Sequence, residues 1–192
     1  MPNFNPAPAC QILKASRERP FAQFTEEETR MTKLGCLAAG FVALLSCSAS
    51  AEVLQERNMP MDVALELAQG AVKACAADNY NVSAAVVDRA GVLRALLRAD
   101  NAGVHTPDAA RRKAYTAVSA RTPTSAMAKN IQENPAAAQL TAIDNFLILA
   151  GGVPIKLGDE TIGAIGVGGA PGGNLDEACA LKAIKAIEGK LK

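Results

Sequence analysis

Residues 151–173, GGVPIKLGDETIGAIGVGGAPGG, say more about the fold of this chain than any other part of its sequence. They contain two apolar runs, at residues 153–157 and 161–167, and the tripeptide GDE joins them. Two such runs around a short turn that contains glycine are typical of a β-hairpin. The stretch therefore predicts two antiparallel strands, followed by a glycine-rich loop.

A second hairpin is predicted upstream, where VSAAVVD at 82–88 and VLRALLR at 92–98 flank the turn Arg89-Ala90-Gly91. Glycine in that turn can take the positive φ that tight hairpin turns require. A short apolar run at 146–150 is expected to form one more strand. Together these runs predict an antiparallel sheet of about five strands.

Apolar residues at helical spacing precede, separate and follow the hairpins. Residues 61–77 predict an N-terminal helix, and the segment from Asn174 onward predicts a C-terminal one. Between the hairpins, Thr106 is expected to cap a helix that begins at Pro107 and ends near residue 120. A second short helix is expected from Pro123 to near residue 133. The fold class is α/β in an α+β arrangement, with the two terminal helices packed on one face of the sheet.

Only two of the five cysteines, Cys75 and Cys179, lie within the predicted domain, one on each terminal helix. Packing of these helices side by side would bring both thiols into one layer. One interpretation is a disulfide formed in an oxidising compartment. The other is a pair of small buried thiols, which is common for free cysteine.

The first 51 residues are interpreted as a region outside that domain. Residues 31–51 have the order of a secretory signal peptide: a basic start, the apolar run LGCLAAGFVALL and a small-residue cleavage site ending at Ala51. Residues 1–30 lack periodicity and are expected to be disordered or an extension ahead of the true start at Met31. Cleavage near Ala51 would leave residues 52–192 as one periplasmic or secreted domain. The sequence LLSC offers the alternative of a lipid anchor on Cys47.

The overall charge excludes one class of partner. The formal net charge is +1, and no run of like charges forms a tail, so we expect no nucleic-acid ligand. The apolar run of the leader is short for a membrane span, and we expect no transmembrane span in the mature chain.

Few side chains are available for chemistry, and the best candidates lie close together in the sequence. His105 is the only histidine, and it precedes the cations Arg111, Arg112 and Lys113 and the aromatic Tyr115. One histidine and two separated cysteines do not make a zinc site, but a single imidazole can hold haem iron. The three cations could meet haem propionates, and Tyr115 is a second possible ligand. The alternatives are a solvated loop histidine and a solvated helix face.

The sequence GVGGAPGG lies between a strand and a helix, which is the setting of a phosphate-binding loop. It matches neither the P-loop nor the full dinucleotide pattern. The alternative is a loop that needs positive φ and close packing.

The motifs VVDRAG, LLRADNAG, RRKAYTA, GGVPIKLGDETIGAIGVGGAPGG and DEACA occur in this order. In this respect the chain resembles the haem-binding GlcG/HbpS family, also described as the haem-degrading domain and related to the C-terminal domain of PduO-type proteins. The resemblance covers nearly all of the predicted domain. It implies a profilin-like or PAS-like fold, a homo-oligomer, and binding of haem or a related tetrapyrrole.

The resemblance places Lys113, Gly151 and Gly152 on family motifs, and it names a ligand better than a reaction. We therefore expect an exported haem-binding protein, with His105 as the candidate axial ligand and its role in sensing, storage or scavenging open. Haem degradation is implied only by the family label, and no catalytic residue is assigned. One alternative is an enzyme acting on a carboxylate metabolite between Lys113, Asp88 and Gly151-Gly152. Another is a non-catalytic oligomeric interaction domain.

Overall fold

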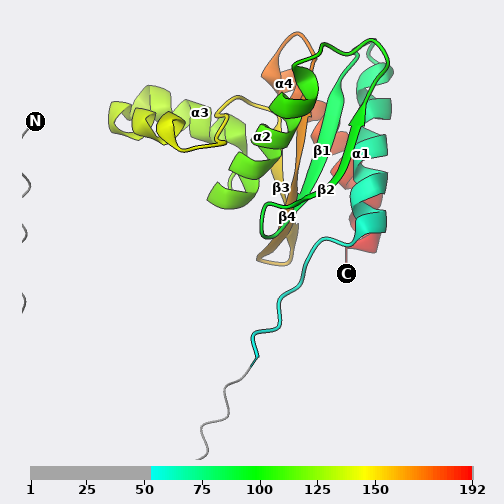
Figure 1. The fold of residues 1–192 in the computed structure, drawn as a ribbon, viewed down its shortest axis with the longest axis horizontal. Coiled ribbons are helices and arrows are strands. Elements are labelled where there is room, and N and C mark those ends of the chain that lie inside the picture. The colour runs from blue at the N-terminus through cyan, green and yellow to red at the C-terminus, as the bar shows by residue number, and fades with distance from the viewer. Residues whose placement is uncertain (1–52, 192) are drawn as a thin grey trace, which may run out of the picture. The chain divides into compact units, whose positions relative to one another are not determined.

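The two hairpins lie side by side in one antiparallel sheet (Figure 1). The structure, a computed structural model, describes residues 53–191. Its four strands follow the spatial order β2-β1-β4-β3, so the two central strands come from different hairpins. Their bounds are β1 Ser83–Asp88, β2 Leu93–Arg98, β3 Gly152–Leu157 and β4 Glu160–Gly168.

Helices cover both faces of the sheet. The terminal helices α1 (Met61–Ala76) and α4 (Gly173–Ile187) pack against each other on one face, as the sequence predicts. Helix α2 (Thr106–Ala120) covers the other face, and the short 3-10 helix η2 (Glu188–Lys190) follows α4. This arrangement gives the α+β class expected for the domain.

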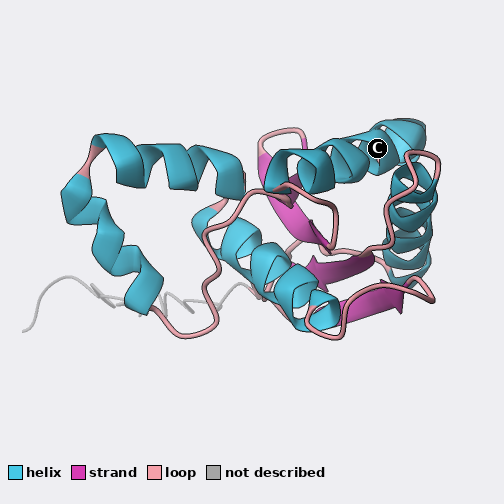
Figure 2. Ribbon diagram, turned by 90° about the horizontal axis from the view of Figure 1, so that it is seen from above, coloured by secondary structure: helices cyan, strands magenta, loops and turns pink. Residues whose placement is uncertain are grey.

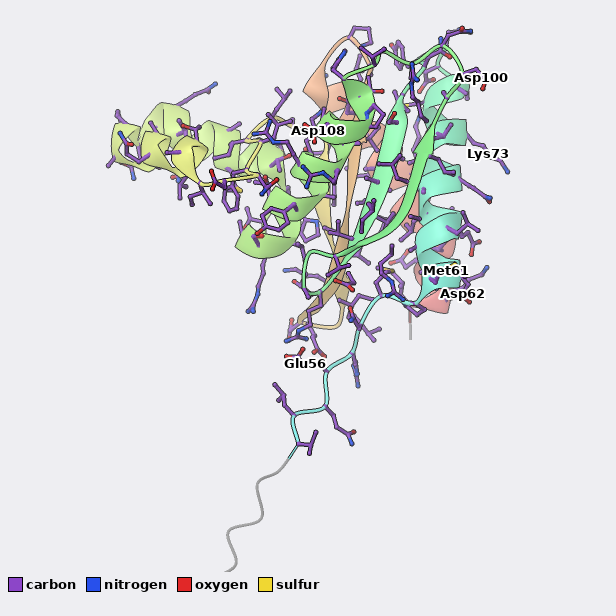
Figure 3. The ribbon with its side chains drawn as sticks, in the orientation of Figure 1. Glu56, Met61, Asp62, Lys73, Asp100 and Asp108 are labelled. Carbon is purple, nitrogen blue, oxygen red and sulfur yellow. A yellow bond between two sulfur atoms is a disulfide. The ribbon has the colours of Figure 1, made fainter. Side chains whose placement is uncertain are left out.

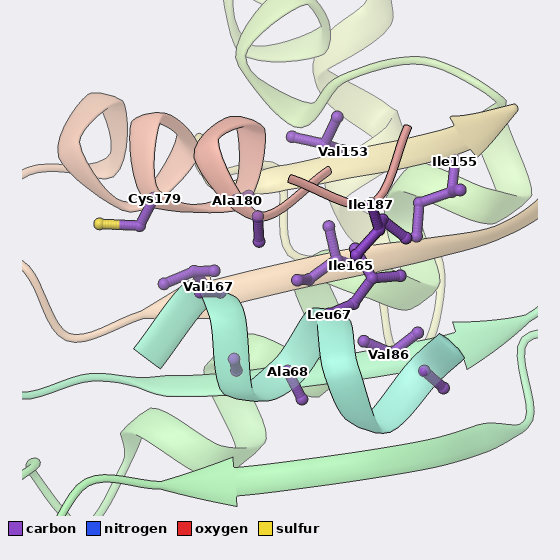
Figure 4. Packing of buried hydrophobic residues seen from close by; sticks show 14 of the residues in the cluster. Leu67, Ala68, Val86, Val153, Ile155, Ile165, Val167, Cys179, Ala180 and Ile187 are labelled. Atoms are coloured by element: carbon purple, nitrogen blue, oxygen red, sulfur yellow. The ribbon is translucent and has the colours of Figure 1, made fainter. Parts of the chain in front are cut away.

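The alternation of side chains along the central strands separates two apolar layers. Ala84 and Val86 of β1 pack toward α1 and α4, whereas Val87 packs toward α2. Figure 4 shows the larger layer, where Leu67 of α1 and Ile187 of α4 meet Ile165 of β4. Because successive residues of a strand point to opposite faces, a central strand between two helix layers is apolar throughout.

Close contact between α2 and the sheet depends on a glycine. A side chain at Gly166 of β4 would overlap the backbone of α2 at Ala110 and Ala114. The helix therefore rests on the strand backbone itself. This contact fixes the height of α2 above the sheet.

An arm projects from the body beyond α2 (Figure 2). We call α3 (Thr124–Glu133) and the 3-10 helix η1 (Pro135–Ala142) together the arm. Within α3 only Thr124 and Met127 are buried, and η1 buries no residue. The arm is thus held at its root.

The prediction of a strand at residues 146–150 is wrong, and the sheet has four strands rather than about five. The backbone of this segment forms hydrogen bonds with side chains of α2 instead of with a neighbouring strand. Arg112 Nη2 donates to the carbonyl of Phe146 (2.7 Å), and the amide of Leu147 donates to Thr116 Oγ1 (2.8 Å). The apolar run therefore packs as a loop against the helix.

A disulfide joins Cys75 of α1 to Cys179 of α4, with their Cα atoms 5.4 Å apart. Both residues are buried in the larger apolar layer. The signal peptide, its cleavage site, the alternative anchor at Cys47 and the extension at 1–30 all lie outside the described residues.

Candidate functional site

A pocket of about 520 Å³ opens where α2 and α4 begin. Between the two helix starts runs the segment of residues 168–173, which we call the glycine loop. Asp108, labelled in Figure 3, marks the first turn of α2 beside it. The pocket is lined by the glycine loop and by His105, Ala109, Lys113, Leu149 and Asp176.

One face of α2 supplies a column of side chains to this pocket. His105, Ala109 and Lys113 follow one another at intervals of four residues, which places them along one side of a helix. His105 is at the exposed outer end, as the N-cap residue of α2, and Lys113 is at the buried inner end. The column therefore runs from solvent into the protein.

The imidazole of His105 is available for a ligand. Its ring lies over Gly103, where an added Cβ would come within 2.8 Å of Cε1. The ring forms no hydrogen bond or ion pair with another residue in the range 53–191. A neutral imidazole nitrogen is a common ligand for metals, haem iron included.

Lys113 is bound at the inner end of the pocket by a buried ion pair. Its Nζ lies 2.7 Å from Asp176 Oδ2 and donates to the carbonyl of Val167 at 2.9 Å. The side chains of Lys113 and Asp176 are only 2% and 4% exposed. Asp176 Oδ1 accepts from the amide of Ala170 in the glycine loop (2.9 Å). The pair thus joins α2, the end of β4, the glycine loop and α4.

Gly151 and Gly152 lie behind this ion pair rather than on the pocket wall. Gly151 has φ +118°, and a Cβ there would come within 3.0 Å of Lys113 Nζ and 2.8 Å of Asp176 Cβ. Its amide donates to Glu177 Oε2 (3.4 Å), and the amide of Gly152 donates to Thr124 Oγ1 (2.9 Å). The two glycines let β3 approach the buried pair and the root of the arm.

The structure separates the other predicted site residues from this pocket. Arg111 pairs with Asp108 and with the side chain of Asn145, while Arg112 holds the carbonyl of Phe146. The ring of Tyr115 meets the Phe146 ring edge-on, with centroids 6.3 Å apart, and covers the turn at Gly91. None of the three is among the lining residues.

Of the residues of the alternative site, the structure brings Lys113 and the two glycines together and places Asp88 apart from them. Asp88 faces Gly163 in the sheet, whereas Lys113 contacts Val167, four residues further along β4. At the strand rise this is a separation of about 13 Å. The Asp88 carboxylate accepts instead from the amides of its own turn, Ala90 and Val92, both at 3.0 Å.

Two details differ from the sequence predictions. Thr106 is not the N-cap, because its hydroxyl donates to the carbonyl of Gly103 (2.8 Å) and contacts Ser83 Oγ (2.7 Å). Asp176 was not predicted as a site residue. The signal for it is Lys113, a charged residue on the buried face formed by Ala110, Ala114 and Ala117, since a buried cation requires an anionic partner.

The described part of the chain is limited in the kinds of site that it can form. Residues 53–191 contain no group of three or more histidine, cysteine, aspartate or glutamate side chains arranged to hold a metal ion. The helices within that range are too short or too polar to span a membrane.

Comparisons with known proteins give a consistent family. The model of the family described as "Haem degrading protein HbpS-like" matches residues 59–185. An uncharacterised 15.0 kDa protein from the dhaT-dhaS intergenic region of Citrobacter freundii is 35% identical over 118 residues, which cover 60% of this chain and 82% of that protein.

Solved structures agree with this match. A double mutant of Streptomyces reticuli HbpS is 40% identical with a TM-score of 0.68, and the alignment covers 72% of this chain and 92% of that one. The crystal structure of a PduOC–haem complex has the same fold, with 23% identity and a TM-score of 0.61 over 68% of this chain and 95% of that one. With a family model that matches from Met59, ahead of α1, to Lys185 in α4, the chain belongs to the HbpS-like family.

Proposed function

We propose that this protein binds haem or a related tetrapyrrole in the pocket between the start of α2 and the glycine loop. One observation carries the proposal: His105, the only histidine, lies on a pocket of about 520 Å³ with no partner among residues 53–191 for its ring. That volume is in the range of sites for small molecules and cofactors. The family description and the PduOC–haem complex support the same ligand class.

The pocket offers an imidazole to haem iron, but the one lysine among its lining residues is already paired and is not free to bind the haem carboxylates. His105 would supply an imidazole for the iron, and Leu149 and Ala109 would supply apolar contact for the macrocycle. Lys113 is neutralised by Asp176, and Arg111 and Arg112 bind the loop at residues 145–146. When bound, haem would supply the redox chemistry of its iron, and the imidazole of His105 would hold that iron.

A haem titration of the purified protein tests the proposal. We expect a Soret shift with the wild type, its loss in His105→Ala, and its retention in Val104→Ala, a control at an 88% exposed neighbour. Tyr115→Phe should also keep the shift, because the Tyr115 ring packs on Phe146 outside the pocket. Absence of a shift in the wild type, or an equal shift in His105→Ala, would overturn the assignment.

Haem degradation is a separate question for the same complex. Peroxide added to the haem complex should release no more iron or bilin than a free-haem control if the protein only binds its ligand. Release above that control would extend the proposal from binding to degradation.

We also propose that the protein is exported after cleavage near Ala51. A disulfide between Cys75 and Cys179 is consistent with an oxidising compartment such as the periplasm. N-terminal sequencing of protein from a periplasmic extract should begin at Glu52. Recovery of the uncleaved chain from the cytoplasmic fraction, with its first residues still present, would contradict export.

Self-association is the last part of the proposal, and the arm supports it. Within the arm only Thr124 and Met127 are buried, and Ile143 just after it is 45% exposed. Sedimentation should show an oligomer that Ile143→Asp weakens and that Val92→Asp, on a hairpin turn, leaves intact. A monomeric wild type would contradict this part alone.

A further inference from the structure

We propose that the buried Lys113–Asp176 pair is the positioning element of the pocket, setting the distance between His105 and the glycine loop. The idea rests on the proposed function in taking this pocket as the ligand site. Its structural core, the control of the glycine loop by the pair, can be measured without any ligand.

Few hydrogen bonds hold the middle of the glycine loop. The amide of Ala170 donates to Asp176 Oδ1 at 2.9 Å. Within residues 53–191 this is the only hydrogen bond between a side chain and the backbone of the loop. The carbonyl of Gly172 accepts hydrogen bonds only locally, from the amides of Leu175 and Asp176 at the start of α4. The Asp176 carboxylate therefore controls where the middle of the loop lies.

Asp176 is in turn fixed to α2 through Lys113. The Nζ to Oδ2 distance of 2.7 Å and the bond from Nζ to Val167 O at 2.9 Å place the ammonium between α4 and the end of β4. Lys113 stands two helical turns from His105 on the same face of α2. A shift of the pair would therefore move the glycine loop relative to the imidazole.

The charges of the pair compensate each other and are not offered to a ligand. Both side chains are almost fully buried, and a buried ion pair is stable only when each partner's charge and hydrogen bonds are satisfied. Lys113 thus acts through the loop, as a positioning residue. This revises its predicted role as a cation for propionates.

Double variants can separate positioning from folding, because removing both members of a buried pair is often tolerated where removing one is not. Lys113→Met with Asp176→Leu removes the pair and the acceptor for Ala170. Lys113→Met with Asp176→Asn removes the charges but keeps an oxygen that can accept from Ala170. Lys129→Gln with Glu133→Gln removes an exposed ion pair on the arm and is the matched control.

Amide hydrogen exchange of the haem-free variants is the first measurement. We expect exchange in the glycine loop to rise about tenfold in K113M/D176L, as for loss of one structural hydrogen bond, with β1 and α1 unchanged. K113M/D176N should restore most of the protection, and the control pair should change nothing. Unchanged loop exchange in a folded K113M/D176L protein would overturn the proposal. If that variant does not fold, the double variant Lys113→Met with Asp176→Ala, which also lacks Asp176 Oδ1, takes its place. Loop exchange equal to that of the wild type in this second variant would overturn the proposal in the same way.

Haem titration of the same variants is the second measurement. Affinity should fall about tenfold in K113M/D176L and recover in K113M/D176N, in parallel with loop protection. Loss of affinity without a change in the loop would mean that the pair contacts the ligand directly, against the proposal. A wild type that binds no haem would refute the proposed function, whereas the exchange experiment would still decide whether the pair positions the loop.

Discussion

Lys113 brings a charge into the interior on the face of α2 that packs against the sheet. Its neighbours on the buried face are alanines, and its ammonium finds Asp176 on α4 and the carbonyl of Val167 on β4. Burial of such a group is stable only with its partner in place. The residue therefore ties together elements that are distant in the sequence.

Replacing Lys113 alone should be costly. In Lys113→Met the Asp176 carboxylate stays buried without its counter-ion, and the expected loss of stability is about 3–5 kcal/mol. Lys129→Met, which breaks an exposed pair on the arm, should change stability by about 0–1 kcal/mol. Urea unfolding of the two variants measures both values. A loss below that of the control would show that the pair contributes nothing to the fold.

Adjacency in the sequence predicts that Arg111, Arg112 and Lys113 act together, and the structure divides them. Successive residues of an α-helix point about 100° apart, so three neighbours face three directions. Lys113 points into the core, while Arg111 and Arg112 reach the loop at residues 145–146. Spacing of four residues, as between His105 and Lys113, is the better guide to a shared site.

At the scale of elements, α2 and β4 form the contact on which the pocket depends. Gly166 lets the helix approach the strand, and the pocket opens where the glycine loop leaves that strand. The hairpins and terminal helices could be predicted because their periodicities are local. The strand at 146–150 could not be excluded, since a short apolar run is common both to strands and to loops that pack against a helix.

A methyl group at Gly166 should therefore disturb the fold. Gly166→Ala would force α2 away from β4, and such overpacking typically costs about 1–3 kcal/mol. Gly189→Ala is the control, because nothing lies within 4 Å of an added Cβ there. Thermal unfolding of both variants tests the contact. Equal melting temperatures would mean that α2 does not rest on the strand as described.

For the whole molecule, the sheet and the two terminal helices form one core closed by a disulfide. Cys75 and Cys179 are 104 residues apart in the sequence, and both are buried between α1 and α4. Helix packing made this pairing a reasonable interpretation, but sequence alone does not give the distance between two Cα atoms. The family resemblance, by contrast, is confirmed, because several ordered motifs identify a fold better than one residue does.

Loss of the disulfide should lower global stability. Cys75→Ala with Cys179→Ala removes a cross-link that closes a long loop, and the expected cost is about 2–5 kcal/mol. Denaturant unfolding compares the variant with the oxidised wild type. Mass analysis under non-reducing conditions should also show no free thiol at either position in the wild type. Two free thiols would contradict the cross-link.

The location of haem on the protein tests the central claim most directly. In a ¹⁵N-labelled sample, substoichiometric ferric haem should broaden the amide signals of residues 103–109 and of the glycine loop, because the paramagnetic iron would lie next to His105. Signals of the arm and of the turn at Gly91 should remain sharp. Broadening centred on Tyr115 and Phe146 instead, with His105 and the glycine loop unaffected, would contradict the assignment of the pocket.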